Sequence, residues 1–109
     1  MIRFVNVVQA GQLAEAVRYR LAEVLRAAAS DAFGAADAPV VWREVAQGHG
    51  WTAGRPSRTS VVLCEVPDDT PTSVRTALMQ RVNAEWVSAT GTDPNALLIF
   101  TYTPLTGGR

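Results

Sequence analysis

The sequence predicts an α+β fold in which two strand–helix–strand units share a four-stranded mixed sheet, with two helices on one face. Three observations predict it. The chain has 109 residues, which suits one domain, residues 1–109, with a single core. Each half carries a helical apolar stripe between two short runs rich in β-branched residues. The halves, residues 2–46 and 59–103, repeat that order, so each should form a right-handed crossover between parallel strands.

The first half begins with a strand candidate at residues 2–8, an apolar run that Gly11 interrupts. From Leu13 onward, apolar residues recur three or four positions apart, which is the stripe of an amphipathic helix. The stripe fades by Gly34, and a second strand is expected over residues 40–45. These elements make up one β-α-β unit.

The connection over residues 47–58 contains three glycines and one proline in twelve positions. Such a composition does not suit a regular element, so we expect a loop or an irregular hairpin. Connections of this length that carry aromatic and charged residues are usually functional or disordered.

The second half repeats the order of the first. A buried strand is expected over residues 59–66, and a helix follows it, with Thr70 as a plausible cap and Pro71 at the first helical position. Gly91 is a natural stop for that helix, and residues 97–102 form the last strand candidate.

The centres of two of these strands, residues 61–64 and 97–100, are continuously apolar, which is typical of strands buried on both faces. Two helices cover only one face of a four-stranded sheet. We therefore expect the other face to be buried by further copies of the chain, since self-association is the simplest way to cover it.

The composition excludes several classes of protein. Ten arginines balance ten acidic residues and there is no lysine, which argues against nucleic acid as a partner, although arginine suits a carboxylate ligand. No apolar run approaches the roughly 20 residues that cross a bilayer, and the first residues do not resemble a signal peptide, so we expect a cytoplasmic protein without a membrane partner. The single cysteine, Cys64, forms neither an internal disulfide nor a zinc cluster by itself. We expect no metal and no cofactor.

The duplicated pattern resembles the tautomerase superfamily, which includes 4-oxalocrotonate tautomerase, macrophage migration inhibitory factor, malonate semialdehyde decarboxylase and the 3-chloroacrylic acid dehalogenases. The resemblance covers roughly residues 2–103, and its most specific part is residues 52–62, a glycine loop that enters a strand. The order and spacing of later residues support it, namely Arg75, Trp86, Thr90, Gly91, Asp93 and Pro94. The resemblance implies a homotrimer with a pocket at each subunit boundary, built from the N-terminus and the 47–60 loop.

In that family the chemistry depends on a proline that is exposed when the initiator methionine is removed. Its secondary amine acts as a general base or as a nucleophile. When Gly11 is aligned with the glycine that follows the family's first strand, Ile2 stands at the proline position and Gln12 stands where an arginine is common. Ile2 is too bulky for routine methionine removal, so Met1 is expected to stay and the proline mechanism does not carry over.

Two residues are candidates for moving a proton. The α-amine of Met1 would act as a weaker base or imine former, and the alternative is a start residue that pairs in an edge strand. His49 lies between two glycines, and an imidazole is a side chain suited to act as a general acid or base. The alternative for His49 is an exposed loop residue.

The candidate carboxylate ligands are Arg55 and Arg58, because a guanidinium holds a carboxylate through two parallel hydrogen bonds. The alternatives are two solvated arginines or a salt bridge within the trimer. Arg43 is a further candidate, while Trp42 beside it points to the opposite face and belongs to the core or to a subunit interface. The other residues predicted to bind substrate are Ile2, Trp51 and Tyr102.

The sequence therefore predicts a tautomerase-like protein that acts on or binds a small carboxylate or keto–enol acid without the usual proline. As an enzyme it would be a tautomerase, a decarboxylase or a hydratase. The alternatives are a catalytically degenerate member that binds a small acid or a partner, and a purely structural homo-oligomer.

Overall fold

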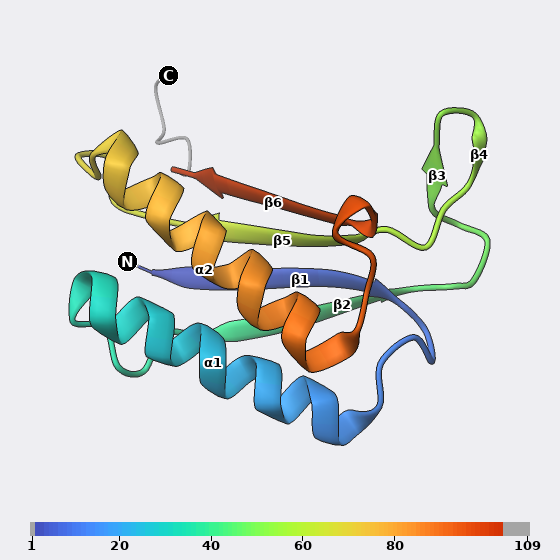
Figure 1. The fold of residues 1–109 in the computed structure, drawn as a ribbon, viewed down its shortest axis with the longest axis horizontal. Helices are drawn as coiled ribbons and strands as arrows, with labels where there is room; N and C mark the ends of the chain where they lie inside the picture. Colours follow the sequence, from blue (N-terminus) through green and yellow to red (C-terminus); the bar gives the residue numbers. More distant parts are fainter. Residues whose placement is uncertain (1, 104–109) are drawn as a thin grey trace.

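The computed structural model describes residues 2–103 of the chain. Four strands form the main sheet in the order β2-β1-β5-β6, and two helices lie against it (Figure 1). The first unit consists of β1 (Arg3–Gln9), α1 (Glu15–Phe33) and β2 (Val40–Val45). The second unit consists of β5 (Ser60–Glu65), α2 (Thr72–Thr90), a short 3-10 helix (Pro94–Ala96) and β6 (Leu97–Tyr102).

The strand directions follow from the two crossovers. Within each unit the strands are parallel, β1 with β2 and β5 with β6. The units meet through β1 and β5, which are antiparallel, so the sheet is mixed. The predicted α+β architecture of two β-α-β units is confirmed.

Both helices have 19 residues and end in the same way. Gly34 and Gly91 adopt left-handed conformations, with φ of 71° and 69°, which turn the chain out of each helix. The prediction for the start of α2 was wrong by one residue. Pro71 is the N-cap and the first helical residue is Thr72. Thr70 lies in the turn before the helix, where its N–H donates to the carbonyl of Pro67 at 3.1 Å, and no side chain caps the helix.

The core fills the space between the helices and the covered face of the sheet. Its centre is Trp86, which is fully buried and packs against Trp42 with the ring centroids 6.0 Å apart. Cys64 is buried in the same cluster, and burial raises the pKa of its thiol to about 12. A thiolate nucleophile is therefore not available there near neutral pH.

The opposite face of the sheet is apolar and only partly buried within one chain. Leu98 and Phe100 of β6 are 49% and 53% exposed. The strand registers place further valines and a leucine beside them on this open face, which comprises Val5, Val7, Val61, Leu63, Leu98 and Phe100. The second apolar surface that the sequence predicts is thus present.

Neither helix in the described part of the chain is long and apolar enough to cross a bilayer.

Candidate functional site

A small hairpin joins the two units and stands away from the main sheet (Figure 1). Its strands are β3 (Trp51–Thr52) and β4 (Arg55–Pro56). The two residues of its turn, Ala53 and Gly54, have φ of 53° and 76°, as a tight two-residue hairpin turn requires. Of the loop and the irregular hairpin expected for this connection, the structure has a hairpin, and its two short strands pair in a regular antiparallel register.

The neck of the hairpin is tied to the end of β1. Ser57 donates its N–H to the carbonyl of Gly50 at 2.6 Å, which closes the neck. The side-chain amide of Gln9 donates to the carbonyl of Ser57. A side chain at Gly50 would crowd this junction, because an added Cβ would lie 3.2 Å from the carbonyl oxygen of Ser57.

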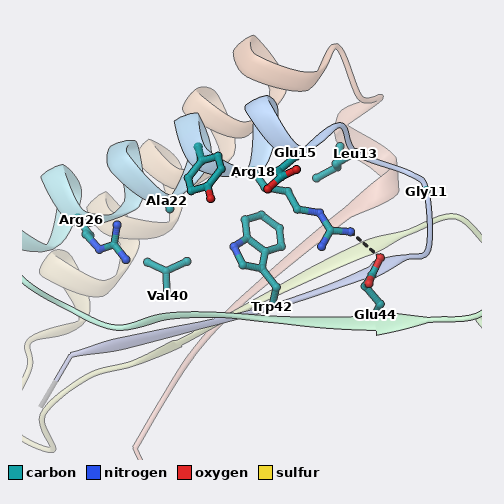
Figure 2. Close-up of a pocket in the computed structure, with 10 residues that line it drawn as sticks. Gly11, Leu13, Glu15, Arg18, Ala22, Arg26, Val40, Trp42 and Glu44 are labelled. Atoms are coloured by element: carbon teal, nitrogen blue, oxygen red, sulfur yellow. Dashed lines mark hydrogen bonds and ion pairs between the residues drawn. The ribbon is translucent and has the colours of Figure 1, made fainter.

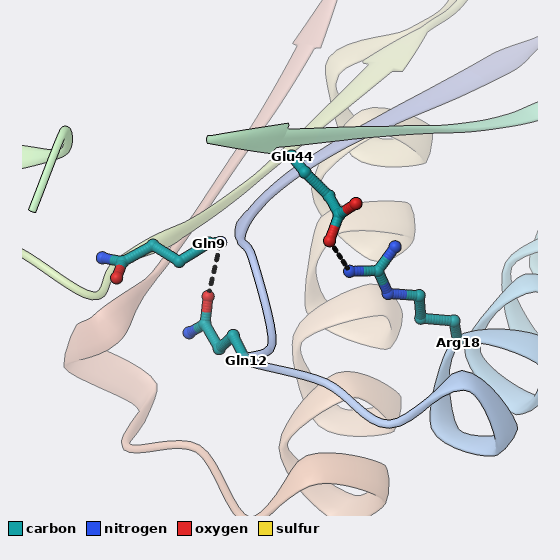
Figure 3. Close-up of polar contacts among 4 residues, drawn as sticks. All are labelled: Gln9, Gln12, Arg18 and Glu44. Carbon is teal, nitrogen blue, oxygen red and sulfur yellow. Dashed lines mark hydrogen bonds and ion pairs between the residues drawn. The ribbon is translucent and has the colours of Figure 1, made fainter. Parts of the chain in front are cut away.

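Gln12, in the loop between β1 and α1, makes a second tie. Its Oε1 accepts the N–H of Gln9 at 2.9 Å (Figure 3), and its Nε2 donates to the carbonyl of Arg58 at 2.8 Å. We call Gln9 and Gln12 together the glutamine clamp. The clamp joins the end of β1 to two consecutive carbonyls of the segment between the hairpin and β5.

A cavity of about 380 Å³ lies beside this neck. It is lined by Gln9, Gln47, Gly48, Pro56, Ser57 and Arg58. A guanidinium and two amide side chains around one hollow supply the donors that a carboxylate needs. Among residues 2–103, the ion pairs join Arg3 to Glu65, Arg18 to Glu44 and Arg81 to Asp31, so neither Arg55 nor Arg58 has a carboxylate partner there.

Four of the predicted site residues lie close together in sequence on this hairpin or at its ends. Trp51 and Arg55 belong to its two strands, His49 precedes it and Arg58 follows it. All four side chains are exposed, and Trp51 is 64% exposed. Of these, only Arg58 lines the cavity.

Ile2 and Tyr102 lie at the other end of the sheet. The hairpin follows β2, and because β2 is parallel to β1, it lies where β1 ends rather than where β1 begins. Tyr102 pairs with Glu65, which in turn pairs with Arg3 at the start of β1. One chain alone therefore does not bring the N-terminus and the hairpin into a single pocket.

The remaining predicted residues are also outside the cavity. Ile2 is 6% exposed and belongs to the hydrophobic core. Arg43 is exposed on β2, level with Val7 of β1. The hydroxyl of Tyr102 donates to Glu65 at 3.3 Å. Met1 lies outside the described residues.

A larger groove, of about 600 Å³, lies between α1 and β2 (Figure 2). Trp42 forms part of its wall, with the guanidinium of Arg18 5.3 Å from the centre of the indole ring. That guanidinium also donates to Glu44 at 2.8 Å (Figure 3). Two charged side chains of this groove, Arg18 and Glu44, are thus paired with each other, and none of the predicted site residues lines the groove.

Sequence reasoning did not find Gln9 and Gln47 as lining residues of the cavity. One signal was available for Gln9, which is a polar residue at the end of an apolar strand and is only 7% exposed. Within residues 2–103, no group of histidine, cysteine, aspartate or glutamate side chains is arranged to hold a metal ion.

No family model matches the sequence, and no curated protein matches it. Solved structures do match. The native protein Ps01740 is 22% identical over 93% of this chain and 92% of its own, with a TM-score of 0.88. N1, a member of the cis-3-chloroacrylic acid dehalogenase family, is 14% identical over 94% of this chain and 74% of its own, with a TM-score of 0.87. A fused 4-OT, described as a symmetric trimer, is 17% identical over 93% of this chain and 84% of its own, with a TM-score of 0.82.

Proposed function

From the premise that the chain has the fold of the tautomerase superfamily, we propose that it is a tautomerase-like protein that binds a small keto or enol carboxylic acid. Arg58, assisted by Arg55, holds the carboxylate, and the proline mechanism of the family is not used. The observation that carries this proposal is the cavity at the hairpin neck, which Arg58 lines together with Gln9 and Gln47. Arg58 has no carboxylate partner among residues 2–103.

We also propose that the protein is a homotrimer with its pockets at the subunit boundaries. The open apolar face of the sheet supports this, since exposed patches of that kind usually mark an association surface. The fused 4-OT structures, described as trimers, support it as well. In such an assembly the start of β1 in one subunit can approach the hairpin of another, which a single chain does not allow.

The assembly is tested by sedimentation equilibrium. The proposal predicts a mass about three times the 11.7 kDa of one chain. Phe100→Glu, which places a charge on the open face, should shift the protein toward the monomer, whereas Tyr19→Glu, at an exposed position on α1, should not. A wild-type monomer at micromolar concentration contradicts the proposal.

In the catalytic form of the proposal, a base takes a proton from the carbon next to the carbonyl, and a proton is returned to the other end of the enolate. His49 or the α-amine of Met1 moves the proton, and the arginines stabilise the negative charge. That pair of proton transfers is a tautomerisation. In a decarboxylation the bond to the carboxylate would break instead, CO2 would leave, and the same group would protonate the enolate that remains. In a hydration it would take a proton from water as the water oxygen adds to a carbon–carbon double bond of the acid.

A second form, binding without turnover, is favoured by the position of Ile2. The residue that the family resemblance aligns with the catalytic proline has its side chain in the core, at 6% exposure. A buried isoleucine supplies no group that takes or gives a proton. This form keeps the carboxylate site and loses the base.

Arg58→Ala separates these forms from a purely structural role. We expect it to weaken phenylpyruvate binding, measured by calorimetry, by about 10- to 100-fold, the size of a charge-assisted hydrogen bond. Turnover of phenylenolpyruvate or 2-hydroxymuconate by the wild type, lost in the same variant, supports the catalytic form. The matched control is Arg20→Ala, at an exposed position on α1, which should change neither phenylpyruvate binding nor turnover. If the wild type shows neither binding nor turnover, the purely structural homo-oligomer is favoured.

Ile2→Pro, in a protein whose methionine is removed, distinguishes the catalytic form of the proposal from the form that binds without turnover. Turnover that appears only in this variant indicates a pocket that lacks its base. The mass of the intact wild-type protein shows whether Met1 is present, and a retained Met1 excludes secondary-amine chemistry at residue 2.

A further inference from the structure

We propose that Gln12 is a positioning residue for the carboxylate site. It does not line the cavity, and it acts by fixing the backbone that carries Arg58. The part of this inference that concerns ligand binding rests on the proposed function. The part that concerns the backbone does not, and it is measurable without any ligand.

The segment that the clamp holds lies between two ladders of hydrogen bonds. β4 ends at Pro56 and β5 begins at Ser60, so three residues lie between the hairpin and the main sheet. On the other side, the last residue of β1 that pairs with β5 is Val7, which is level with Val61. Gln9 therefore lies beyond the end of the β1–β5 ladder, and it continues the connection through its side chain.

Gln12 connects β1 to the segment after the hairpin through both the oxygen and the nitrogen of its side-chain amide. The oxygen accepts the N–H of Gln9 at 2.9 Å, and the nitrogen donates to the carbonyl of Arg58 at 2.8 Å. The two bonded segments are therefore joined by a donor and an acceptor on the same planar group. Glutamate keeps the oxygen but has no N–H to donate, and alanine keeps neither.

Residues 57–59, which the clamp holds, also have hydrogen bonds among themselves. The clamp is therefore expected to affect the position of this segment rather than its local shape. Ser57 and Thr59 are linked by two local hydrogen bonds, from the Ser57 hydroxyl to the Thr59 hydroxyl at 2.8 Å and from the Thr59 N–H to the Ser57 hydroxyl at 3.1 Å. These bonds set the shape of the turn but not its position on the sheet. The position comes from the clamp, which ties the carbonyls of Ser57 and Arg58 to the end of β1.

A fixed backbone raises ligand affinity because less conformational freedom is lost on binding. Without Gln12, the Arg58 guanidinium samples a wider volume around the cavity. Binding then weakens although no group that contacts the ligand has been removed. An enzyme so altered shows a raised KM and a nearly unchanged kcat, provided that substrate binding equilibrates before the chemical step.

The test compares Gln12→Ala and Gln12→Glu with Gln80→Ala, which removes an exposed glutamine of α2. Amide hydrogen exchange is measured on the full chain without ligand. We expect exchange at Ser57 and Thr59 to become at least tenfold faster in both Gln12 variants. Exchange at Gln9 should accelerate only in Gln12→Ala, because glutamate still offers an oxygen to that N–H. Gln80→Ala should resemble the wild type throughout.

The binding arm uses phenylpyruvate, for which we expect about tenfold weaker affinity in both Gln12 variants, with unfolding transitions close to that of the wild type. Unchanged exchange at Ser57 and Thr59 overturns the inference, as does equal affinity of wild type and variants. Failure of the wild type itself to bind phenylpyruvate overturns the proposed function and, with it, the ligand role of Gln12. The exchange data distinguish this case, since they still show whether the clamp holds the segment.

Discussion

The two β-α-β units of this protein are closely similar in scaffold, whereas the segment that connects them has no counterpart inside either unit. Each unit has a 19-residue helix that ends on a glycine with positive φ, and each places a proline shortly before its second strand. Between the units, the chain makes the β3–β4 hairpin, and the clamp ties the hairpin neck to β1. The duplicated parts thus build the sheet and the core, while the cavity is lined mostly by the segment that is not duplicated, with Gln9 contributed by β1.

The largest expected difference is in the free energy of unfolding, between replacing a tryptophan of the core, Trp86, and replacing a tryptophan of the hairpin, Trp51. Trp86→Ala removes a fully buried ring from the core of the scaffold and should lower the free energy of unfolding by about 3–5 kcal/mol. Trp51→Ala removes a ring that is 64% exposed on the hairpin and should change it by less than about 0.5 kcal/mol. Urea denaturation measures both values. A large loss for Trp51→Ala would show that the hairpin is part of the folding unit.

Asn6 of β1 is a place where the two units differ inside the core. Its side chain is fully buried, and neither amide atom has a hydrogen-bond partner among residues 2–103, while its neighbour in β5 is Val62. A buried amide without a partner costs about 1–3 kcal/mol. Asn6→Leu should therefore raise the free energy of unfolding by about 1 kcal/mol or more, as measured by chemical denaturation. A decrease of similar size would mean that the amide is satisfied in solution.

The two helix-ending glycines test whether the units are equivalent. Gly34→Ala and Gly91→Ala each force an alanine into a left-handed conformation, although nothing lies near the added Cβ in either case. Each should cost about 1 kcal/mol, with the two values within about 0.5 kcal/mol of each other. Thermal unfolding of the two variants, side by side, gives the comparison. Clearly unequal losses of stability in the two variants would show that the two units, although alike in structure, differ in how much their helix ends contribute to folding.

The scaffold could be predicted from the sequence because its signals are local. Apolar spacing predicted both helices, and the β-branched runs predicted the four strands of the main sheet. The start of α2 was misjudged by one residue, because Thr70 lies in a turn that is closed on the Pro67 carbonyl, and the composition does not show where that turn ends and the helix begins. The fold that the family resemblance implied agrees with the solved structures.

The candidate site could be predicted only in part. The hairpin agrees with the glycine-rich composition of one segment, and Arg58 was a candidate because a guanidinium suits a carboxylate; its role as a ligand stays a prediction. The bonds of Gln9 and Gln12 to the Ser57 and Arg58 carbonyls join residues 48 and 46 positions apart, and no local pattern indicates them. The separation of Ile2 from the hairpin is a consequence of parallel strands, and so it depends on topology rather than on the residues themselves.

The proposed function requires that a small carboxylate binds at the hairpin neck through Arg58. A titration of the ¹⁵N-labelled protein with phenylpyruvate, followed by amide chemical shifts, tests it most directly. We predict saturable shifts over residues 47–60 and at Gln9 and Gln12, absent in Arg58→Ala and retained in Arg20→Ala. Shifts centred instead on the groove between α1 and β2, or no shifts at millimolar concentration, would show that the hairpin neck does not bind the carboxylate.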